Sequence, residues 1–545
     1  MKIGAGYRKG KNALLLTALG IAFYACGRGS RTSEGDMGKG GSLVAEMELE
    51  SKVMPYPASQ FASVEALDYK VDVLDTLHSG TVDDLVDLYM GAPGVFTFRG
   101  NLKRNADFCG RVIGRPDTLI VNWTFDTDMD NRETSVGIWG GGTGWTGQPL
   151  YVCWPDSVLR RFRKELPSGG YKLSKQEIIF GSLCSKAYFL DFETGKQSRP
   201  SIDVTNPIKG TVSLDPTMNG NLYIGQGVPA VESIGAMCVN LFQHRITHFY
   251  GKDFKAWRGW HAYDSSPIRL GHFLIRPSEN GTLYKFLIEE NGNLALHSTL
   301  RFRKKNTFVA GGIESSIAVV ANYGVVGDNH GCVVCVDLNT MQPVWYYSLG
   351  DDIDASPVIE MEADTPYVYV GCEVDRQGLE GTARLAKLNV LDGSEVWCLK
   401  TPAYKAEVGE KHFDGGYYAT PLLGQGNCKD VIFVNFVENS TGTRRPGYFM
   451  AVNKHTGDIL YRVKLRNYAW SSPVLFLNEK DECYVLTADT YGFVYLFDGK
   501  DGKELCCLRV GSNFESSPIV VGNQIVVGSR GKTIYKLTIV NRKKS

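Results

Sequence analysis

The sequence lacks any excess of charge. Lys and Arg together number 59, as do Asp and Glu, so the formal net charge is zero. A protein that binds nucleic acid through its phosphates needs a basic excess or a basic stripe. The short basic clusters at 160–164 and 301–305 lie beside turn-like segments, and we interpret them as solvated loops. No nucleic-acid partner is therefore expected.

Signatures of common catalytic and metal sites are also missing. We find no phosphate-binding loop, no assignable Ser-His-Asp order, no paired glycosidase carboxylates and no Cys-x-x-Cys-His haem attachment site. Cys332 and Cys335 would point to opposite faces of a strand, and no second pair lies at zinc-ribbon spacing. His244 and His248 would lie about 13 Å apart on one strand face, too far for one metal ion. We predict no metal site.

No apolar run near the N-terminus is long enough to span a bilayer comfortably. Residues 13–25 are apolar and follow four basic residues, which indicates an export signal. The run ends in Phe23-Tyr24-Ala25-Cys26, which resembles a bacterial lipobox with Cys26 as the lipidated residue. Cleavage of the signal without lipidation, or an uncleaved anchor, remains open. Lipoboxes prefer Leu where Phe23 stands and a small residue where Tyr24 stands. We expect a lipoprotein-type signal peptide at 1–26 and a flexible tether, rich in Gly, Ser and charge, at 27–50.

What the sequence does contain is a repeat of about 45 to 60 residues that begins near Trp145. Each copy has an Asp- or Asn-based turn that ends in or near Gly, suited to a hairpin. Four short strands per copy cannot bury both faces alone, so the copies must stack around an axis. Each copy opens with a Ser-Pro-like pair, namely Ser266-Pro267, the degenerate Ser316-Ile317, Ser356-Pro357, Thr420-Pro421, Ser472-Pro473 and Ser517-Pro518.

Counting the copies predicts an all-β, eight-bladed β-propeller over residues 107–541. The last copy supplies only three strands, at 518–521, 524–528 and 533–540. Its missing strand is available at 118–125, and pairing this N-terminal strand with the C-terminal blade would close the ring and remove an exposed edge. The copies begin near Thr146, Lys209, Asp264, Glu314, Asp354, Tyr418, Trp470 and Glu515.

The repeat resembles that of the quinoprotein-type, or PQQ-like, eight-bladed propeller family. In that family a hydrophobic-Asp-x-x-Thr-Gly hairpin precedes a tryptophan that docks between neighbouring blades. The matching residues here are Trp345 and Trp397, while Tyr461 and Cys506 occupy the tryptophan's place in two later copies. The resemblance covers about 107–540 and is specific for fold. It is weak for function, because the scaffold serves both dehydrogenases and proteins without catalysis.

The cysteines do not indicate a disulfide framework. Quinone-dependent alcohol dehydrogenases carry a vicinal disulfide in a loop beside the cofactor, but Cys506 and Cys507 fall in a predicted strand, where we favour a buried structural role. Most other cysteines, such as Cys238, Cys372 and Cys483, lie in apolar strands. We therefore expect mainly buried thiols and at most a few disulfides.

The residues at the strand-opening position form the main candidate site. The repeat places them at corresponding heights around the axis, where the innermost strands line a channel. They could be a structural clip, in which each acid accepts a bond from the next blade's backbone, or a funnel for a cation, a basic peptide or sugar hydroxyls, with aromatic stacking faces. The candidates for a channel-mouth site are Lys209, Asp264, Glu314, Asp354, Tyr418, Trp470 and Glu515.

The first hypothesis is a non-catalytic, monomeric, membrane-tethered propeller, similar in build to the lipoprotein scaffold of the bacterial outer-membrane β-barrel assembly machinery. It would face the periplasm and bind an envelope protein or glycan, without a cofactor, through the channel mouth and the loops 137–147, 375–382 and 438–446. In the first loop, Trp139 or Trp145 would either anchor a partner or plug the channel. The alternative is a dehydrogenase that uses PQQ with calcium, or a polysaccharide-active enzyme, although the cofactor residues cannot be matched one by one.

The segment 51–106 differs from the repeats and is predicted to be a partly helical N-terminal extension. Residues 82–88 show helical spacing around acidic residues. The extension would either pack on the rim of the propeller or space it from the lipid.

Overall fold

The computed structural model describes residues 64–82, 85–106, 109–144, 147–166, 172–289, 292–408, 411–439 and 446–541. The predicted leader with Cys26, the tether 27–50, and Trp145 with Thr146 lie outside these ranges. Within them the regular structure is mainly strand, with one α-helix, α1 (Asp156–Glu165), and one 3-10 turn, η1 (Gly426–Cys428). Neither helix is long and apolar enough to cross a membrane.

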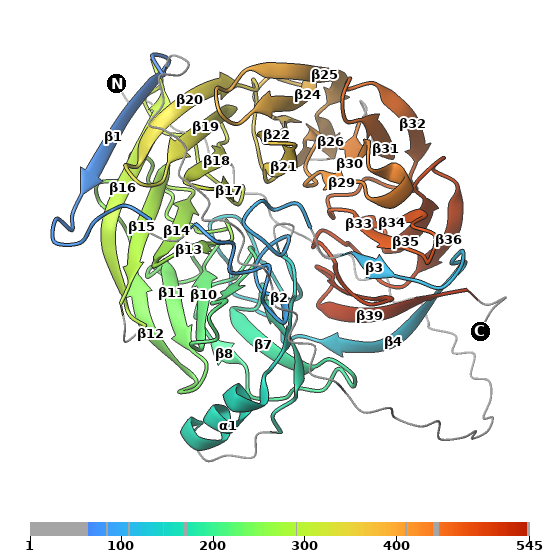
Figure 1. Cartoon of the computed structure of the whole chain (residues 1–545), viewed down its shortest axis with the longest axis horizontal. Helices are drawn as coiled ribbons and strands as arrows, with labels where there is room; N and C mark the ends of the chain where they lie inside the picture. Colours follow the sequence, from blue (N-terminus) through green and yellow to red (C-terminus); the bar gives the residue numbers. More distant parts are fainter. Residues whose placement is uncertain are drawn as a thin grey trace.

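Within the described residues, eight sheets of four or more strands follow one another around a common centre (Figure 1). We number these sheets as blades 1 to 8 in chain order. Blade 1 contains β5 (Leu150–Cys153), β6 (Gln176–Gly181), β7 (Lys186–Asp191) and β8 (Ile202–Asp203); blade 2 contains β9 (Ser213–Leu214), β10 (Asn221–Gly225), β11 (Ala236–Asn240) and β12 (Arg245–Tyr250). Blade 3 contains β13 (Ile268–Leu270), β14 (Phe273–Ser278), β15 (Thr282–Ile288) and β16 (Leu294–Lys304); blade 4 contains β17 (Ala318–Val320), β18 (Tyr323–Gly327), β19 (Cys332–Asp337) and β20 (Gln342–Ser348).

The second half of the ring follows the same plan. Blade 5 contains β21 (Val358–Glu362), β22 (Thr365–Gly371), β24 (Glu380–Asn389) and β25 (Glu395–Tyr404); blade 6 contains β29 (Leu422–Leu423), β30 (Val431–Val437), β31 (Gly447–Asn453) and β32 (Ile459–Lys464), extended by β23 (Glu373–Val374) and β28 (Gly415–Gly416). Blade 7 contains β33 (Val474–Leu477), β34 (Cys483–Ala488), β35 (Phe493–Asp498) and β36 (Glu504–Arg509); blade 8 contains β37 (Ile519–Val521), β38 (Gln524–Gly528) and β39 (Thr533–Val540). A separate hairpin joins β26 (Ala406–Val408) to β27 (Lys411–Phe413). The predicted all-β, eight-bladed propeller is confirmed.

Burial along the strands follows from the stacking of blades. Every residue of β19 and β34 is buried, because these middle strands are covered on both faces by the neighbouring blades. The outer strand β32 instead alternates between exposed and half-buried residues. The core is therefore a set of layers between blades and not one central cluster.

The last blade takes its fourth strand from the N-terminal part of the chain. Strand β4 (Thr118–Asp126) pairs antiparallel with β39, with Thr118 opposite Val540, Val121 opposite Leu537 and Phe125 opposite Ile534. This is the pairing predicted from the sequence, and it joins the two ends of the described propeller in one sheet (Figure 1). The pairing covers the free edge that β39 would otherwise present.

The Ser-Pro pairs form hydrogen bonds from blade to blade. In five successive blades a backbone N–H donates to the hydroxyl at the same position of the next blade, at 2.9 to 3.2 Å. The copies of blades 3 to 8 therefore open with Ser or Thr because that hydroxyl links adjacent blades. The bonds run from Ser266 to Ser316, from Ser316 to Ser356, from Ser356 to Thr420, from Thr420 to Ser472 and from Ser472 to Ser517.

The described part of the N-terminal extension packs on the propeller. Strand β1 (Leu67–Val73) adds a fifth strand to blade 3 by pairing with β16. The helical spacing at 82–88 is not realised, since no helix occurs in residues 64–82 or 85–106. Asp87 instead accepts backbone hydrogen bonds from Tyr89 and Leu102, and its apolar neighbours Val82 and Leu85 are buried against the blades. Tertiary burial of these apolar residues outweighs the local helical pattern.

Residues 96–104, between β2 (Gly94–Val95) and β3 (Gly110–Arg111), lie across the centre of the ring (Figure 1). The Arg99 guanidinium donates to the carbonyls of Pro421 and Pro473 at 3.1 and 2.9 Å. Arg104 donates to the carbonyls of Ile317 and Ser266, both at 2.9 Å. The two arginines therefore bind strand-opening carbonyls of blades 3, 4, 6 and 7. Residues 96–104 therefore fill the centre of the ring on the side of these carbonyls.

Candidate binding site at the channel mouth

Lys209 is the centre of a buried charge cluster at the other end of the channel. It lies in the segment that leads into blade 2, and its ammonium contacts the Asp264 carboxylate directly. It also lies 3.8 Å from Glu279 and 3.6 Å from Glu314. The oxygens of Asp264, Glu279 and Glu314 all fall within 4.8 Å of one another, close enough to share one cation. In this structure the Lys209 ammonium supplies that positive charge.

A second acidic group continues around the axis. The Asp354 and Glu373 carboxyls share a hydrogen bond, and the Tyr418 hydroxyl donates to Glu373. The Tyr418 ring stacks on Trp470, with centroids 4.8 Å apart and planes inclined by 25°. The predicted residues Asp354, Tyr418 and Trp470 are thus connected by contacts. Glu373 contacts both Asp354 and Tyr418.

The contacts return to Lys209 through Trp139. Glu515, from the segment before blade 8, accepts a hydrogen bond from Arg530 at 3.3 Å. The Arg530 guanidinium lies 4.7 Å from the centre of the Trp139 ring, and the Lys209 ammonium lies 5.8 Å from it. Both distances fit cation–π contacts. Trp139 is half-buried and lines a cavity with Lys209.

Burial sets the protonation of this cluster. It raises the pKa of Asp264, although the nearby Lys209 opposes the rise. Burial also raises the pKa of Glu279 and Asp354, and the charge of Glu314 adds to both increases. For Lys209 burial favours the neutral amine, but the surrounding carboxylates outweigh it and raise its pKa. The mouth therefore combines a retained ammonium with several carboxyls that hold their protons easily.

A cavity of about 530 Å³ opens above this cluster. Its charged lining comes from Lys209, Arg258, Glu279 and Glu314, and its apolar lining from Val136, Trp139, Val228 and Trp260. Two basic and two acidic side chains beside two tryptophans suit a partner that brings both polar and apolar groups.

The predicted site residues do not all reach this cavity. Lys209 and Glu314 line it, whereas Asp264 and Glu515 are 1% and 2% exposed and lie beneath it. Asp354, Tyr418 and Trp470 are half-buried. Ser and Thr hydroxyls accept five blade-to-blade bonds in the described residues, and the two interpretations of the acids, clip or funnel, stay predictions. Thr146 lies outside the described residues.

Sequence reasoning missed Glu279, Glu373 and Arg530. Glu279 lies in the turn after β14, Glu373 begins the short β23, and Arg530 lies in the turn before β39. None occupies the repeated strand-opening position, so the register alone could not select them. Their charged type inside otherwise apolar repeats was the available signal.

The docking aromatics lie against glycines of the next blade. The Trp345 indole N–H donates to the Val390 carbonyl at 2.7 Å, and that of Trp397 to the Lys454 carbonyl at 2.9 Å. The Tyr461 hydroxyl donates to the Gly499 carbonyl at 2.8 Å. A Cβ added to the turn glycine beside each ring would lie less than 3.0 Å from it, so glycine is required at Gly393, Gly457 and Gly502.

The residues do not fit a site for PQQ with calcium of the kind the resemblance suggests. Cys506 and Cys507 are not disulfide-bonded to each other, and they lie in β36, the outer strand of blade 7, and not beside the channel. The cluster of three close carboxylates holds the Lys209 ammonium, so a calcium ion there would have to displace it. We derive no chemical step through this cofactor.

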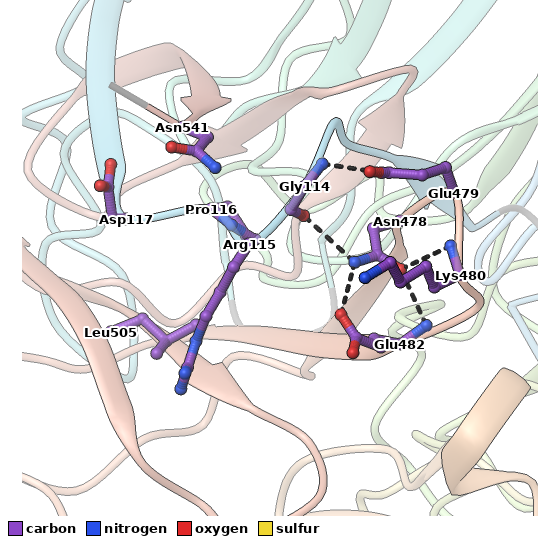
Figure 2. A pocket seen from close by; sticks show the side chains of 10 residues that line it. All are labelled: Gly114, Arg115, Pro116, Asp117, Asn478, Glu479, Lys480, Glu482, Leu505 and Asn541. Atoms are coloured by element: carbon purple, nitrogen blue, oxygen red, sulfur yellow. Dashed lines mark hydrogen bonds between the residues drawn. The ribbon is translucent and has the colours of Figure 1, made fainter. Parts of the chain in front are cut away.

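A larger cavity, of about 620 Å³, lies between the β33–β34 turn of blade 7 and the segment that leads into β4 of blade 8 (Figure 2). The Gly114 N–H donates to Glu479 at 2.7 Å, and the Asn478 side chain donates to Glu482 at 2.7 Å and to the Gly114 carbonyl at 3.3 Å. Figure 2 shows these polar groups directed at one another across the turn. We interpret this site as a joint that fixes the segment after β3 to blade 7.

Comparison with known proteins finds a family model for the last part of the chain and solved structures with the same fold. Residues 446–545 match the family model of the outer membrane protein assembly factor BamB. The matched part contains the two outer strands of blade 6 and all of blades 7 and 8 apart from β4. The predicted resemblance to PQQ-like propeller repeats is thereby confirmed. No curated protein sequence matches the chain.

Solved structures share the propeller architecture at low identity. A quinohemoprotein alcohol dehydrogenase from Comamonas testosteroni superposes with a TM-score of 0.54 at 12% identity, covering 82% of this chain and 80% of that chain. A quinohemoprotein alcohol dehydrogenase from Pseudomonas putida gives 0.55 at 10% identity, with the same coverages. BamB from Moraxella catarrhalis gives 0.45 at 15% identity, covering 69% of this chain and 96% of that chain. At these identities the likeness to the two dehydrogenases concerns the fold alone.

Proposed function

We propose that this chain is a non-catalytic propeller of the bacterial cell envelope, tethered to a membrane by a lipid on Cys26, that binds a protein partner at the channel mouth. The family match to an outer membrane assembly factor over residues 446–545 and the lipobox-like leader support this environment. The opposite end of the channel is filled by residues 96–104, which leaves the mouth face as the accessible end.

Two exposed phenylalanines, in loops that lead into residues of the mouth, carry the proposal. Phe254 is 93% exposed and Phe308 is 96% exposed. Phe254 lies in the loop that leads from β12 to Asp264, and Phe308 in the loop that leads from β16 to Glu314. Two fully solvated phenylalanines are costly for a free protein and typical of an interface. The loop of Phe254 also contains Trp260, and the loop of Phe308 leads into Glu314, and both Trp260 and Glu314 line the cavity.

A crosslinked pulldown from membranes tests this surface. The variant Phe254→Ser with Phe308→Ser removes both anchors without touching a buried contact, so we expect loss of the captured envelope partner with unchanged folding. Lys196→Ser, an exposed change in the turn between β7 and β8, is the matched control and should leave capture intact. Equal capture by the double variant and the wild type would contradict the proposal.

A quinone-dependent dehydrogenase is the second candidate, favoured by the fold shared with the two alcohol dehydrogenases. Addition of PQQ with calcium to the purified protein distinguishes the two functions. The scaffold proposal predicts no bound chromophore and no dye-linked alcohol oxidation. Saturable binding with turnover would replace the scaffold proposal by the enzyme.

A further inference from the structure

Two thiols meet at the joint between blades 6 and 7. Cys428 ends η1, between β29 and β30 of blade 6, and Cys483 begins β34 of blade 7. The two side chains are hydrogen-bonded to each other. Both sulfurs also lie against Gly499, at 3.1 and 3.2 Å from the point where a Cβ on that residue would stand. The missing side chain of Gly499 leaves the space in which they meet.

The backbone around the pair is held in place from both sides. The Asn427 side-chain carbonyl accepts a bond from the Cys483 N–H at 2.8 Å, and the Asn427 N–H donates to the Asp481 carbonyl at 2.9 Å. The Gly499 N–H donates to the Cys483 carbonyl at 2.8 Å. The thiols are therefore fixed opposite one another by a network between the blades, and are not a chance approach of mobile side chains.

The two sulfurs differ in reactivity. The hydrogen bond from Cys483 lowers the pKa of Cys428, with a smaller contribution from Lys500, whereas the same bond and burial raise the pKa of Cys483. Cys428 is thus the better nucleophile of the pair. It lies in a short turn between the exposed residues Asn427 and Lys429, so local opening of that turn exposes it.

We infer that Cys428 and Cys483 are a disulfide-forming pair that links blade 6 to blade 7 when the protein meets a disulfide oxidant. The Cys428 thiolate attacks one sulfur of the oxidant's disulfide, forms a mixed disulfide and releases one thiolate of the oxidant. The Cys483 thiol then loses its proton and attacks the Cys428 sulfur, which releases the second oxidant thiolate. Two electrons pass to the oxidant, and the two protons lost by the cysteines leave it as two thiols.

The position gives this bond a structural purpose. At this joint the docking residue is Tyr461, whereas the two preceding joints use Trp345 and Trp397. A tyrosine buries less apolar area than a tryptophan, so this joint has less aromatic packing. A covalent link from η1 to β34 would compensate by restraining the blades on both sides of Tyr461.

The test incubates the purified full-length protein with oxidised glutathione and maps peptides by mass spectrometry without reduction. We expect one dominant crosslinked peptide pair, containing Cys428 and Cys483, and a Tm a few degrees higher than that of the reduced protein. Cys428→Ser should abolish both effects. Cys506→Ser, at a half-buried thiol in β36, is the matched control and should preserve both.

Crosslinks distributed among other cysteines, or separate glutathione adducts on Cys428 and Cys483 in protein with native circular dichroism, would overturn the inference. The wild-type peptide map does not depend on the folding of any variant. The outcome is also independent of partner capture at the mouth, so failure of one proposal does not affect the other.

Discussion

At the residue scale, Lys209 shows how the mouth is stabilised. Its side chain is 6% exposed and faces the carboxyls of Asp264, Glu279 and Glu314. When one partner of a buried group of opposite charges is removed, the remaining charge has no counterion. The resulting loss of stability is larger than the stability that the complete group contributes. The lysine is therefore a structural counterion as well as part of the cavity wall.

Lys209→Met should lower the free energy of unfolding by about 3–5 kcal/mol, because three carboxyls lose their shared cation. Urea unfolding followed by circular dichroism measures the loss. Adding Asp264→Asn to Lys209→Met should recover part of it. Lys175→Met, at an exposed lysine that pairs with Asp156, is the control and should change stability little. An unchanged urea midpoint for Lys209→Met would contradict the counterion role.

Asp328 should make stability depend on pH. Burial raises its pKa to about 6, while the backbone N–H groups of His330 and Cys332 both donate to it. A carboxyl whose pKa is raised by folding stabilises the fold below the unfolded pKa near 3.8, and this contribution is lost as the pH rises through 6. Asp328→Asn cannot lose a proton, so its stability should exceed that of the wild type increasingly between pH 4 and 7, by up to about 3 kcal/mol. Parallel stability curves for the two proteins would refute the shifted pKa.

At the element scale, much of the fold could be predicted because its signals are local and repeated. The Ser-Pro openings and Asp-Gly turns located the eight blades, and the short last copy located β4 as its partner. The plug at 96–104 could not be predicted, because Arg99 and Arg104 bind backbone carbonyls of distant blades, which carry no side-chain signal. Glu279 and Glu373 could not be predicted for a related reason. Tertiary packing, and not the repeat register, brings them to the axis.

The glycines of the hairpins should be required for blade docking. In Gly457→Ala the new Cβ would lie 2.8 Å from the Trp397 ring, in a residue with φ of +77°. Gly522→Ala also has positive φ, +60°, but nothing lies within 4 Å of its Cβ. Gly522→Ala should cost about 1–2 kcal/mol from backbone strain alone. Gly457→Ala should cost about 1–3 kcal/mol more, from overpacking against Trp397. Thermal unfolding that ranks the two variants equally would exclude the docking contact.

At the scale of the whole molecule, the N-terminal segment and the ring form one body. Arg104 donates to Ile317, Ser266, Thr97 and Phe98, and is fully buried. The plug therefore links the beginning of the described chain to blades 3 and 4.

Arg104→Met should detach the plug, because it leaves buried carbonyls without donors at about 1–3 kcal/mol each. Hydrogen exchange should speed up in residues 96–106 and at the strand openings of blades 3 and 4. Arg111→Met, at an exposed arginine that pairs with Asp481, is the control and should leave exchange in these regions unchanged. Unaltered protection in Arg104→Met would show that the plug is held by other contacts.

The direction of partner binding is the central claim, and site-specific photocrosslinking in intact cells tests it most directly. A photoreactive residue at 308 lies in the loop that leads into Glu314 at the mouth. One at 196 lies in the turn between β7 and β8, on the opposite face because successive antiparallel strands alternate in direction. We predict a crosslink from position 308 to one defined envelope protein and none to that protein from position 196. The same partner captured from both positions, or only from 196, would contradict the account.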